Sequence, residues 1–351
     1  MQKVRAKDFS SISKSTVLIF SMLGISLILL LFIIFSKPLP TYEKSEIFSL
    51  GTYVRIYIAG GKVSSKNLLK IAEKEIERLY AKYSSNIPSS VVYQLNEKRE
   101  IECDEESLFL FQAAVNVSKI TGDSFDPTLR PVLMLWGFDD VNSSKRVPSS
   151  YEIEQVLPFV SYKFIDIDSK NRKIKLLKEG VTVDLGGISK GFIVDRVIDR
   201  IKEIDPKATG FIDAGGDIGI IGPKFGNRPW QIGIRDPFSS DPTKLIDTLY
   251  IYSGAVATSG NYERYFIQNG TLYHHIIDPK TGYPANNCRS CTVISDKVMT
   301  ADAYATGLFV LGIDNPALEY FTKFGVQAYL IDNTGKTVET SGFEYFRNKV
   351  K

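Results

Sequence analysis

The stretch Asp184-Leu185-Gly186-Gly187-Ile188-Ser189-Lys190-Gly191 joins one carboxylate, a glycine pair and one lysine in a short segment. It follows two strand-like segments, Lys173-Ile174-Lys175-Leu176 and Val181-Thr182-Val183. Glycines let the backbone bend and approach a ligand closely, and successive N–H groups with a lysine can bind an anion. The glycine spacing fits neither a Walker loop nor a dinucleotide fingerprint. The stretch therefore indicates a site for a phosphorylated ligand or a plain turn, and alone it does not distinguish the two.

The N-terminal residues predict a membrane anchor. The run 16–35 is apolar and uncharged, and about 20 such residues span a bilayer. No cleavage pattern of small residues follows it, and no cysteine lies nearby to take a lipid. Basic residues precede it: Lys3, Arg5, Lys7 and Lys14. Because basic residues stay on the cytoplasmic side, we expect 1–15 in the cytoplasm, a single transmembrane signal anchor at 16–36, and the rest outside the cell membrane. A cleaved signal peptide is the alternative.

The rest of the chain predicts one domain of mixed structure. We expect a linker at 37–46, around Pro38-Leu39-Pro40, and one catalytic ectodomain at 47–346. The 43 Lys and Arg residues nearly balance the 40 Asp and Glu residues, so nothing indicates nucleic-acid binding. Helices and strands mix without strict alternation, which favours an α+β fold over a doubly wound sheet. Apolar spacing predicts helices at 65–84, 106–121, 189–204 and 299–311. Strands are expected at 47–59, 230–234, 249–253, 272–277, 291–294 and 328–331, and around Phe211.

The cysteines leave two interpretations open. Cys288 and Cys291 could form a local disulfide outside the cytoplasm, or a redox pair. They lead into Thr292-Val293-Ile294, which predicts a strand rather than the helix start that a redox pair occupies. Cys103 is expected to be a half-buried thiol.

The chain has only two histidines, His274 and His275. Their scarcity excludes a metal site built from several histidines, and a Ser-His-Asp triad would need one of this pair. On a strand the two rings point to opposite faces, so at most one faces a given site. The alternative is that the rings simply pack.

Asp302 and Thr306 lie four residues apart in a predicted helix, so both are on one face. A carboxylate and a hydroxyl are hard oxygen ligands suited to Mg²⁺. Alternatively, Asp302 caps the helix and Thr306 bonds back to its own backbone.

Three further motifs carry groups suited to a ligand. Thr258-Ser259-Gly260-Asn261-Tyr262 offers two hydroxyls in turn-like sequence after a strand. Phe125-Asp126-Pro127-Thr128 and Leu135-Trp136-Gly137-Phe138 place aromatic rings beside loops, which suits stacking on a planar ring. Aromatic residues are otherwise most often core.

Taken in order, these segments resemble the ApbE family, the FAD:protein FMN transferases, from about residue 47 to about residue 346. The matching segments are Gly51-Thr52, Phe125-Asp126-Pro127-Thr128, Trp136-Gly137-Phe138, 184–191, Ala214-Gly215-Gly216-Asp217-Ile218, Ile234-Arg235-Asp236-Pro237, Thr258-Ser259-Gly260, His275-Ile276-Ile277-Asp278-Pro279 with Thr281-Gly282, and Ala301-Asp302-Ala303 with Thr306. No single segment is decisive, but the ordered series is specific.

The resemblance implies a Mg²⁺-dependent enzyme that transfers FMN from FAD to a Thr or Ser hydroxyl of an acceptor protein and releases AMP. It implies a metal site of Asp302, Thr306 and the backbone carbonyl of Gly187, and catalytic roles for His275 and Asp302. The residues that it implies for FAD binding are Leu50, Asp126, Trp136, Gly137, Phe138, Asp184, Gly186, Lys190, Gly216, Asp217, Thr258, Ser259, His275 and Ile277. The acceptor is expected to be a flavoprotein of a membrane-associated redox system.

Two other functions fit the same residues. A Mg²⁺-dependent FAD pyrophosphatase would use water in place of the acceptor hydroxyl and would have the same site. A non-catalytic, tethered flavin-binding protein would not need His275, Asp302, Thr306 and Lys190 together.

Overall fold

The computed structural model describes residues 21–22, 24–27 and 41–347. The chain forms two units, Met1–Thr41 and Tyr42–Lys351. In the first unit, residues 21–22 and 24–27 are helical, whereas the segment 1–15, the rest of the predicted anchor 16–36, and residues 37–40 of the predicted linker lie outside the described residues. Within those described ranges, no helix is long and apolar enough to cross a membrane.

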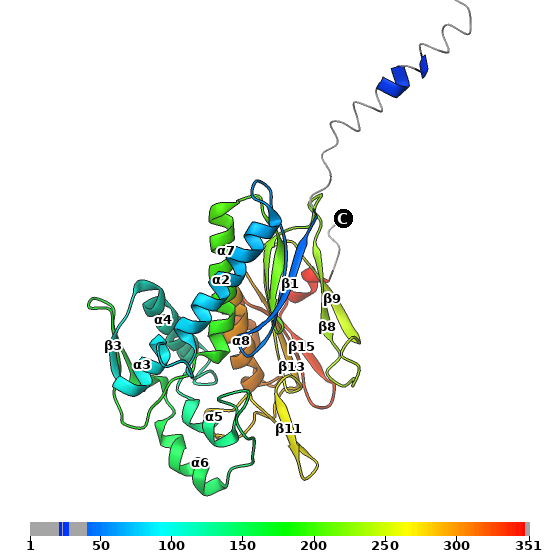
Figure 1. Cartoon of the computed structure of the whole chain (residues 1–351). Helices are drawn as coiled ribbons and strands as arrows, with labels where there is room; N and C mark the ends of the chain where they lie inside the picture. The colour runs from blue at the N-terminus through cyan, green and yellow to red at the C-terminus, as the bar shows by residue number, and fades with distance from the viewer. Residues whose placement is uncertain (1–20, 23, 28–40, 348–351) are drawn as a thin grey trace, which may run out of the picture. The chain divides into compact units, whose positions relative to one another are not determined.

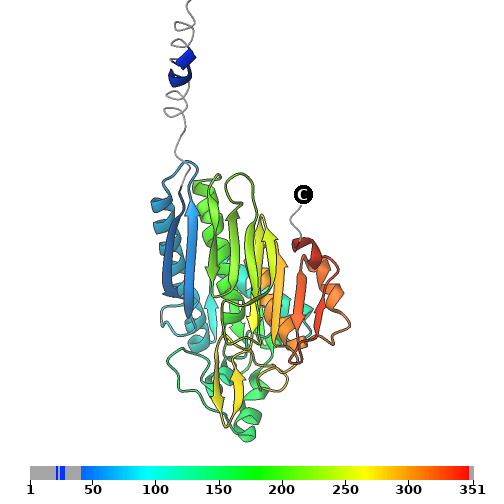
Figure 2. The same ribbon diagram turned by 90° about the vertical axis from the view of Figure 1, so that its right-hand side faces the viewer.

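An antiparallel sheet of eight strands forms the frame of the second unit (Figure 1), in the order β1-β2-β6-β7-β10-β13-β14-β15. Figure 2 shows its strands side by side, with the blue β1–β2 hairpin at one edge and the red β14–β15 pair at the other. The strands are β1 (Glu43–Ser49), β2 (Thr52–Ala59), β6 (Thr209–Ala214), β7 (Asp217–Gly222), β10 (Gly254–Gly260), β13 (Ser290–Ser295), β14 (Gln327–Ile331) and β15 (Thr337–Glu339).

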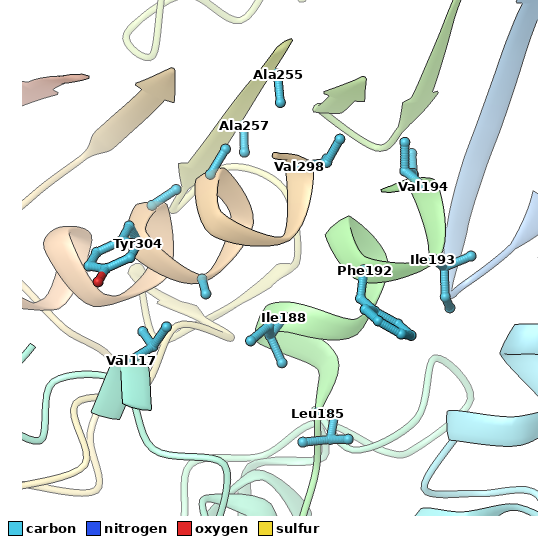
Figure 3. Close-up of a cluster of buried hydrophobic side chains, with 14 of the residues drawn as sticks. Val117, Leu185, Ile188, Phe192, Ile193, Val194, Ala255, Ala257, Val298 and Tyr304 are labelled. Atoms are coloured by element: carbon cyan, nitrogen blue, oxygen red, sulfur yellow. The ribbon is translucent and has the colours of Figure 1, made fainter. Parts of the chain in front are cut away.

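Three helices cover one face of this sheet: α2 (Ser65–Tyr83), α7 (Gly186–Ile204) and α8 (Val298–Leu311). In α2, Ser64 accepts a hydrogen bond from the N–H of Asn67, and the buried residues recur at helical spacing. Helix α8 is buried on nearly every side because it packs against the sheet, against α7 beside it and against α4 (Glu105–Ile120). Figure 3 shows this core, with Ala255 and Ala257 from β10, Val298 and Tyr304 from α8, and Ile188 and Phe192 from α7.

The opposite face is covered by the strand pair β8 (Trp230–Arg235) and β9 (Leu245–Ile251) (Figure 1). Their inward residues pack on Val256 of β10 and Ile294 of β13. Because each fully buried large apolar side chain stabilises the fold by about 1.5–3 kcal/mol, both faces anchor the central strands. The ends of those strands are thereby fixed.

Smaller elements surround one end of the sheet. A three-stranded sheet of β3 (Glu100–Glu102), β5 (Lys173–Leu176) and β4 (Ile165–Asp168) lies beside α3 (Val91–Lys98) and α4 (Glu105–Ile120). Two further helices, α5 (Arg130–Trp136) and α6 (Ser150–Val156), contact each other, and a hairpin is formed by β11 (Tyr265–Gln268) and β12 (Thr271–His274). Short 3₁₀ helices occur at Leu157–Phe159, Tyr162–Phe164, Leu318–Phe324 and Phe343–Phe346.

The predicted α+β class is confirmed, and the predicted helices 65–84, 106–121 and 299–311 agree with α2, α4 and α8 to within a residue at each end. Other boundaries were wrong. The predicted strand 47–59 is two strands, because Leu50 and Gly51 adopt positive φ angles of 57° and 72° and form a two-residue hairpin turn. The first of these strands begins at Glu43, inside the predicted linker.

Five further expectations, most of them near the site, were wrong. Val181-Thr182-Val183 is not a strand, and the glycine pair is the first turn of α7 rather than a turn before it. Thr258-Ser259-Gly260 is the end of strand β10, paired with β13, and not a turn. The strand predicted at 272–277 ends at His274, so His275 lies beyond it. The strand predicted at 249–253 begins at Leu245 and ends at Ile251.

Candidate functional site

A cavity of about 490 Å³ opens where the β1–β2 turn, the β6–β7 turn and the end of β10 meet the first turn of α7. This volume lies in the usual range for small-molecule sites. Helix α8 contributes Asp302 and Thr306 to the wall, and the segment after β12 contributes His275. Distant parts of the sequence therefore converge on one concave surface.

The first turn of α7 lines this cavity, and among its amides the N–H of Gly187 has no hydrogen-bond partner among the described residues. No side chain caps the helix at Leu185, and its first turn contains no acidic residue. Asp184 is held outside the helix, because its carboxylate accepts the N–H of Gly186 at 2.7 Å and the hydroxyl of Ser85 at 2.7 Å. The N-terminus of a long helix attracts anions through its N–H groups and its dipole. The opening stretch therefore favours a phosphate group.

A buried ionic cluster lies directly behind that turn. The Lys190 ammonium contacts the carboxylate of Asp217 and lies 3.2 Å from Asp302 Oδ1. Asp217 and Asp302 are only 4% and 3% exposed. Burial opposes the charge on Lys190, but the two carboxylates outweigh it and hold the lysine pKa above its usual value. Burial, with the nearby Asp302 charge, raises the pKa of Asp217 to about 7.

Two of the residues predicted to hold a metal, Gly187 and Thr306, lie close together. Ser259 Oγ is 3.5 Å from Thr306 Oγ1, and a Cβ at Gly187 would lie 3.6 Å from the same hydroxyl oxygen. Across the described residues, no three His, Cys, Asp or Glu side chains form a metal cluster. The predicted set of Asp302, Thr306 and the Gly187 carbonyl has one carboxylate and two neutral oxygens. That set fits Mg²⁺, which uses few protein carboxylates and keeps water and phosphate ligands.

The two histidines have different surroundings. His274 packs on Phe309, and its ring nitrogens contact the Ala285 carbonyl at 2.9 Å and the Ile276 N–H at 3.3 Å. His275 lines the cavity, with Nδ1 3.2 Å from the Arg264 carbonyl. Burial lowers the pKa of His274 to about 4; burial, with Arg264 and His274, lowers that of His275 to about 3. Because a carbonyl only accepts, the neutral His275 ring carries its proton on Nδ1 and leaves Nε2 as an acceptor.

Acidification should destabilise this fold through the histidines. An unfolded histidine takes up a proton near pH 6.5, whereas folded His274 resists until about pH 4. Between these values the unfolded state binds more protons, so the free energy of unfolding falls as the pH falls, by about 1.4 kcal/mol per unit for each histidine. Urea unfolding at about pH 7 and about pH 4.5 measures the loss. His274→Asn, which does not titrate, should show a smaller loss; an equal loss would contradict this origin.

Most residues predicted to bind FAD or metal lie on the cavity wall. They are Leu50, Asp126, Phe138, Asp184, Gly186, Gly187, Lys190, Asp217, Thr258, Ser259, His275, Ile277, Asp302 and Thr306. Three do not line it: Trp136, Gly137 and Gly216. Trp136 is fully buried among apolar side chains and donates its indole N–H to the Gly282 carbonyl at 2.9 Å, so the structure gives it a packing role in place of stacking. Gly137 ends α5 with a positive φ, and Gly216 lies in the β6–β7 turn.

Asp126 also has a structural task. Its carboxylate accepts hydrogen bonds from the Thr128 N–H, the Thr128 hydroxyl and the Tyr162 N–H, at 2.8, 2.6 and 2.8 Å. These bonds use most of its acceptor capacity, so Asp126 shapes the loop under the cavity. Its contact with a ligand would be secondary.

Several wall residues escaped the sequence analysis. Ser85 holds Asp184, and Arg264 donates to the Phe138 carbonyl at 2.7 Å. Phe48 and Tyr53 flank the β1–β2 turn and stack edge to face at the cavity mouth. None of these four residues has an unusual type or spacing. Only their proximity to a predicted motif could have indicated that they line the cavity.

The three cysteines are free thiols. Cys288 and Cys291 are buried, and burial raises the pKa of Cys288 to about 12. A thiol with a raised pKa is a poor nucleophile. In this structure Cys288 and Cys291 are therefore part of the hydrophobic core, and they form neither a disulfide nor a redox pair.

Comparisons with known proteins agree with the predicted resemblance. A model described as the ApbE family matches residues 50–330. A Haemophilus influenzae protein named FAD:protein FMN transferase is 32% identical over 307 residues, covering 84% of this chain and 88% of that protein. The solved ApbE protein of Thermotoga maritima has a TM-score of 0.83 at 40% identity and covers 88% of this chain and 100% of its own. The flavin transferase ApbE from Vibrio cholerae has a TM-score of 0.76 at 26% identity, over 87% and 99% of the two chains.

Proposed function

Since this chain belongs to the ApbE family, a family of transferases, we propose that it moves FMN from FAD to a Thr or Ser hydroxyl of an acceptor protein. The hydroxyl oxygen would form a bond to the phosphorus on the FMN side of the pyrophosphate. The bond from that phosphorus to the bridging oxygen would break, and AMP would leave with the electron pair. The observation that carries the proposal is the convergence of the α7 N-terminus, Lys190, Asp302, Thr306 and His275 on one cavity.

The first turn of α7 supports a site for the pyrophosphate. Phosphoryl transfer depends mainly on positioning and on stabilising charge on the phosphate oxygens. The N–H of Gly187 and the positive end of the α7 dipole supply partial positive charge for the phosphate oxygens, and Lys190 supplies a fixed cation behind them. Both belong to rigid elements, so they need little reorganisation when the ligand binds.

Asp302, Thr306 and the carbonyl of Gly187 are the residues that would hold Mg²⁺. Bound there, the ion would neutralise charge on the pyrophosphate oxygens as the leaving group departs. Asp302 keeps its orientation because its Oδ2 accepts the N–H of Gly191 at 2.9 Å. Its other oxygen faces Lys190, on the cavity side.

His275 is suited to accept the proton of the attacking hydroxyl. The Arg264 carbonyl fixes its Nδ1, so Nε2 carries the free lone pair. The low pKa of about 3 keeps this lone pair free at neutral pH but makes it a weak base. The negative phosphates of FAD would raise that pKa, and would strengthen the base only when the substrate is bound.

Covalent labelling of an acceptor tests the function. The purified chain is incubated with FAD, Mg²⁺ and a candidate acceptor protein, and flavin that stays on the acceptor after denaturation is measured. We expect labelling with Mg²⁺, with one AMP released per flavin attached, and its loss with excess EDTA. Free FMN and AMP without labelling would instead support the FAD pyrophosphatase. Labelling that persists in EDTA would contradict the metal dependence.

The N-terminal sequence supports a location for this reaction. We propose that residues 16–36 anchor the chain in the cell membrane as a single pass, with residues 47–346 on the extracytoplasmic side, close to acceptors of a membrane-associated redox system. Protease added to intact cells should then remove the catalytic unit. Protection of that unit until lysis would contradict the orientation.

A further inference from the structure

Helices α7 and α8 meet along a regular antiparallel seam. Each contributes residues spaced four apart, which lie along one helix face. The contacting pairs are Gly187 with Thr306, Gly191 with Asp302, and Asp195 with Val298. Figure 3 shows the two helices side by side, with the labelled Val298 at the start of α8. In the first pair both residues are proposed metal ligands, and in the second pair Asp302 is one. The seam and the proposed metal site therefore share residues.

The helices approach closely at the middle of this seam. A Cβ at Gly191 would lie 2.5 Å from the Val298 carbonyl oxygen and 2.7 Å from Met299 Cα. Only glycine permits this distance. As a result, the Gly191 N–H reaches Asp302 Oδ2 at 2.9 Å.

That hydrogen bond affects the proposed carbonyl ligand. In a regular α-helix the N–H of residue 191 donates to the carbonyl four residues earlier, that of Gly187. In α7 this N–H is shared with, or diverted to, Asp302. The bond therefore orients one proposed ligand, Asp302. It also weakens the helical hydrogen bond to the Gly187 carbonyl, so that this second proposed ligand is more available to a metal.

Asp195 fixes the far end of the seam. Helix α8 has no capping side chain of its own at Lys297 and no acidic residue in its first turn. The Asp195 carboxylate, 6% exposed, accepts the N–H groups of Val298 and Met299 at 3.0 and 2.9 Å. A residue of α7 thus caps the N-terminus of α8. The cap holds α8 in one axial position relative to α7.

We propose that Asp195 is a positioning residue for the metal site: by capping α8 from α7 it sets the register that brings Asp302 and Thr306 to Gly187. The proposal rests on the proposed function, since it concerns the Mg²⁺ site assigned there. Asp195 acts through the seam and does not line the cavity. Supporting residues of metal ligands typically contribute about 10–100-fold to metal affinity.

Direct metal binding tests this role without turnover. Mn²⁺, a spectroscopic substitute for Mg²⁺, is titrated into the full-length chain without FAD, and free Mn²⁺ is followed by electron paramagnetic resonance. We expect Asp195→Ala to raise the Mn²⁺ dissociation constant by about 10-fold or more, and Asp195→Asn, which keeps one oxygen acceptor, to raise it less. FAD binding in EDTA should stay within about 2-fold, because the α7 N-terminus is unchanged.

Asp199→Ala is the matched control. Asp199 lies one turn further along α7 and also reaches across to α8, at 3.3 Å from Lys297 Nζ, but it bonds no backbone N–H of α8. It should leave Mn²⁺ affinity unchanged. If Asp195→Ala does not fold, the Mn²⁺ affinity of Asp195→Asn decides whether Asp195 positions the site. Equal affinities in the wild type and the folded Asp195 variant overturn this proposal alone, whereas a wild type that binds no Mn²⁺ overturns the metal assignment as well.

Discussion

Asp302→Asn should reduce FMN transfer on the order of 10³-fold, the upper range for removing one preorganised charge from an active site. The change keeps the shape of the side chain and an oxygen for the Gly191 N–H, so α7 and α8 should stay in register. It removes the one carboxylate among the oxygens proposed to hold Mg²⁺. The rate of covalent flavin attachment to an acceptor, measured at saturating FAD and Mg²⁺, checks this.

Two comparisons make the Asp302 result specific. Asp296→Asn changes an exposed carboxylate just before α8 and should leave the transfer rate unchanged. FAD binding to Asp302→Asn in EDTA should remain close to that of the wild type, because the proposed pyrophosphate contacts lie on α7. A transfer rate equal to that of the wild type would refute the metal assignment.

Lys190→Met should destabilise the fold by roughly 3–5 kcal/mol, the cost of removing one partner from a buried ion pair. Asp217 is 4% exposed and bonded to this lysine, which is itself only 27% exposed. Without Lys190 the Asp217 carboxylate would be left buried beside Asp302, with the two negative charges unbalanced. Urea unfolding followed by tryptophan fluorescence measures the loss, because Trp136 and Trp230 are both buried.

The double variant Lys190→Met/Asp217→Asn separates charge from packing. It removes the orphaned carboxylate, so much of the lost stability should return. Lys244→Met supplies a surface comparison: its ammonium lies 3.0 Å from Asp236 but is 63% exposed, so its loss should cost under about 1 kcal/mol. A double variant no more stable than Lys190→Met would show that the lysine stem, and not the charge, stabilises this region.

Elements with a strong local pattern could be predicted from the sequence. Helix α2 has apolar residues at helical spacing and a serine cap, and its observed bounds differ from those predicted by one residue. Helix α8 was placed equally well, and its four-residue spacing put Asp302 and Thr306 on one face. These features depend on interactions within one segment, which periodicity reports directly.

Elements whose conformation depends on distant contacts were predicted less well. The glycine pair was interpreted as a turn, with or without a bound anion, because glycine permits bent backbone conformations, yet it begins α7. The tight contact with α8 comes one turn later, at Gly191. Thr258-Ser259-Gly260 has turn-like composition but pairs with β13 as a strand. Trp136 stood beside a loop in the sequence and proved to be core, because the side chains that bury it come from other segments.

The sequence by itself determined the family, the α+β class and most of the residues that line the cavity, because residue type, order and local periodicity carry that information. Only the tertiary structure decided how they work together. The segment 184–191 forms the start of a helix that lines a cavity, with Lys190 held between Asp217 and Asp302. The seam that joins 187, 191 and 195 to 306, 302 and 298 depends on the packing of two helices about a hundred residues apart. No local pattern encodes that register, since it is set by close packing and by hydrogen bonds between the helices.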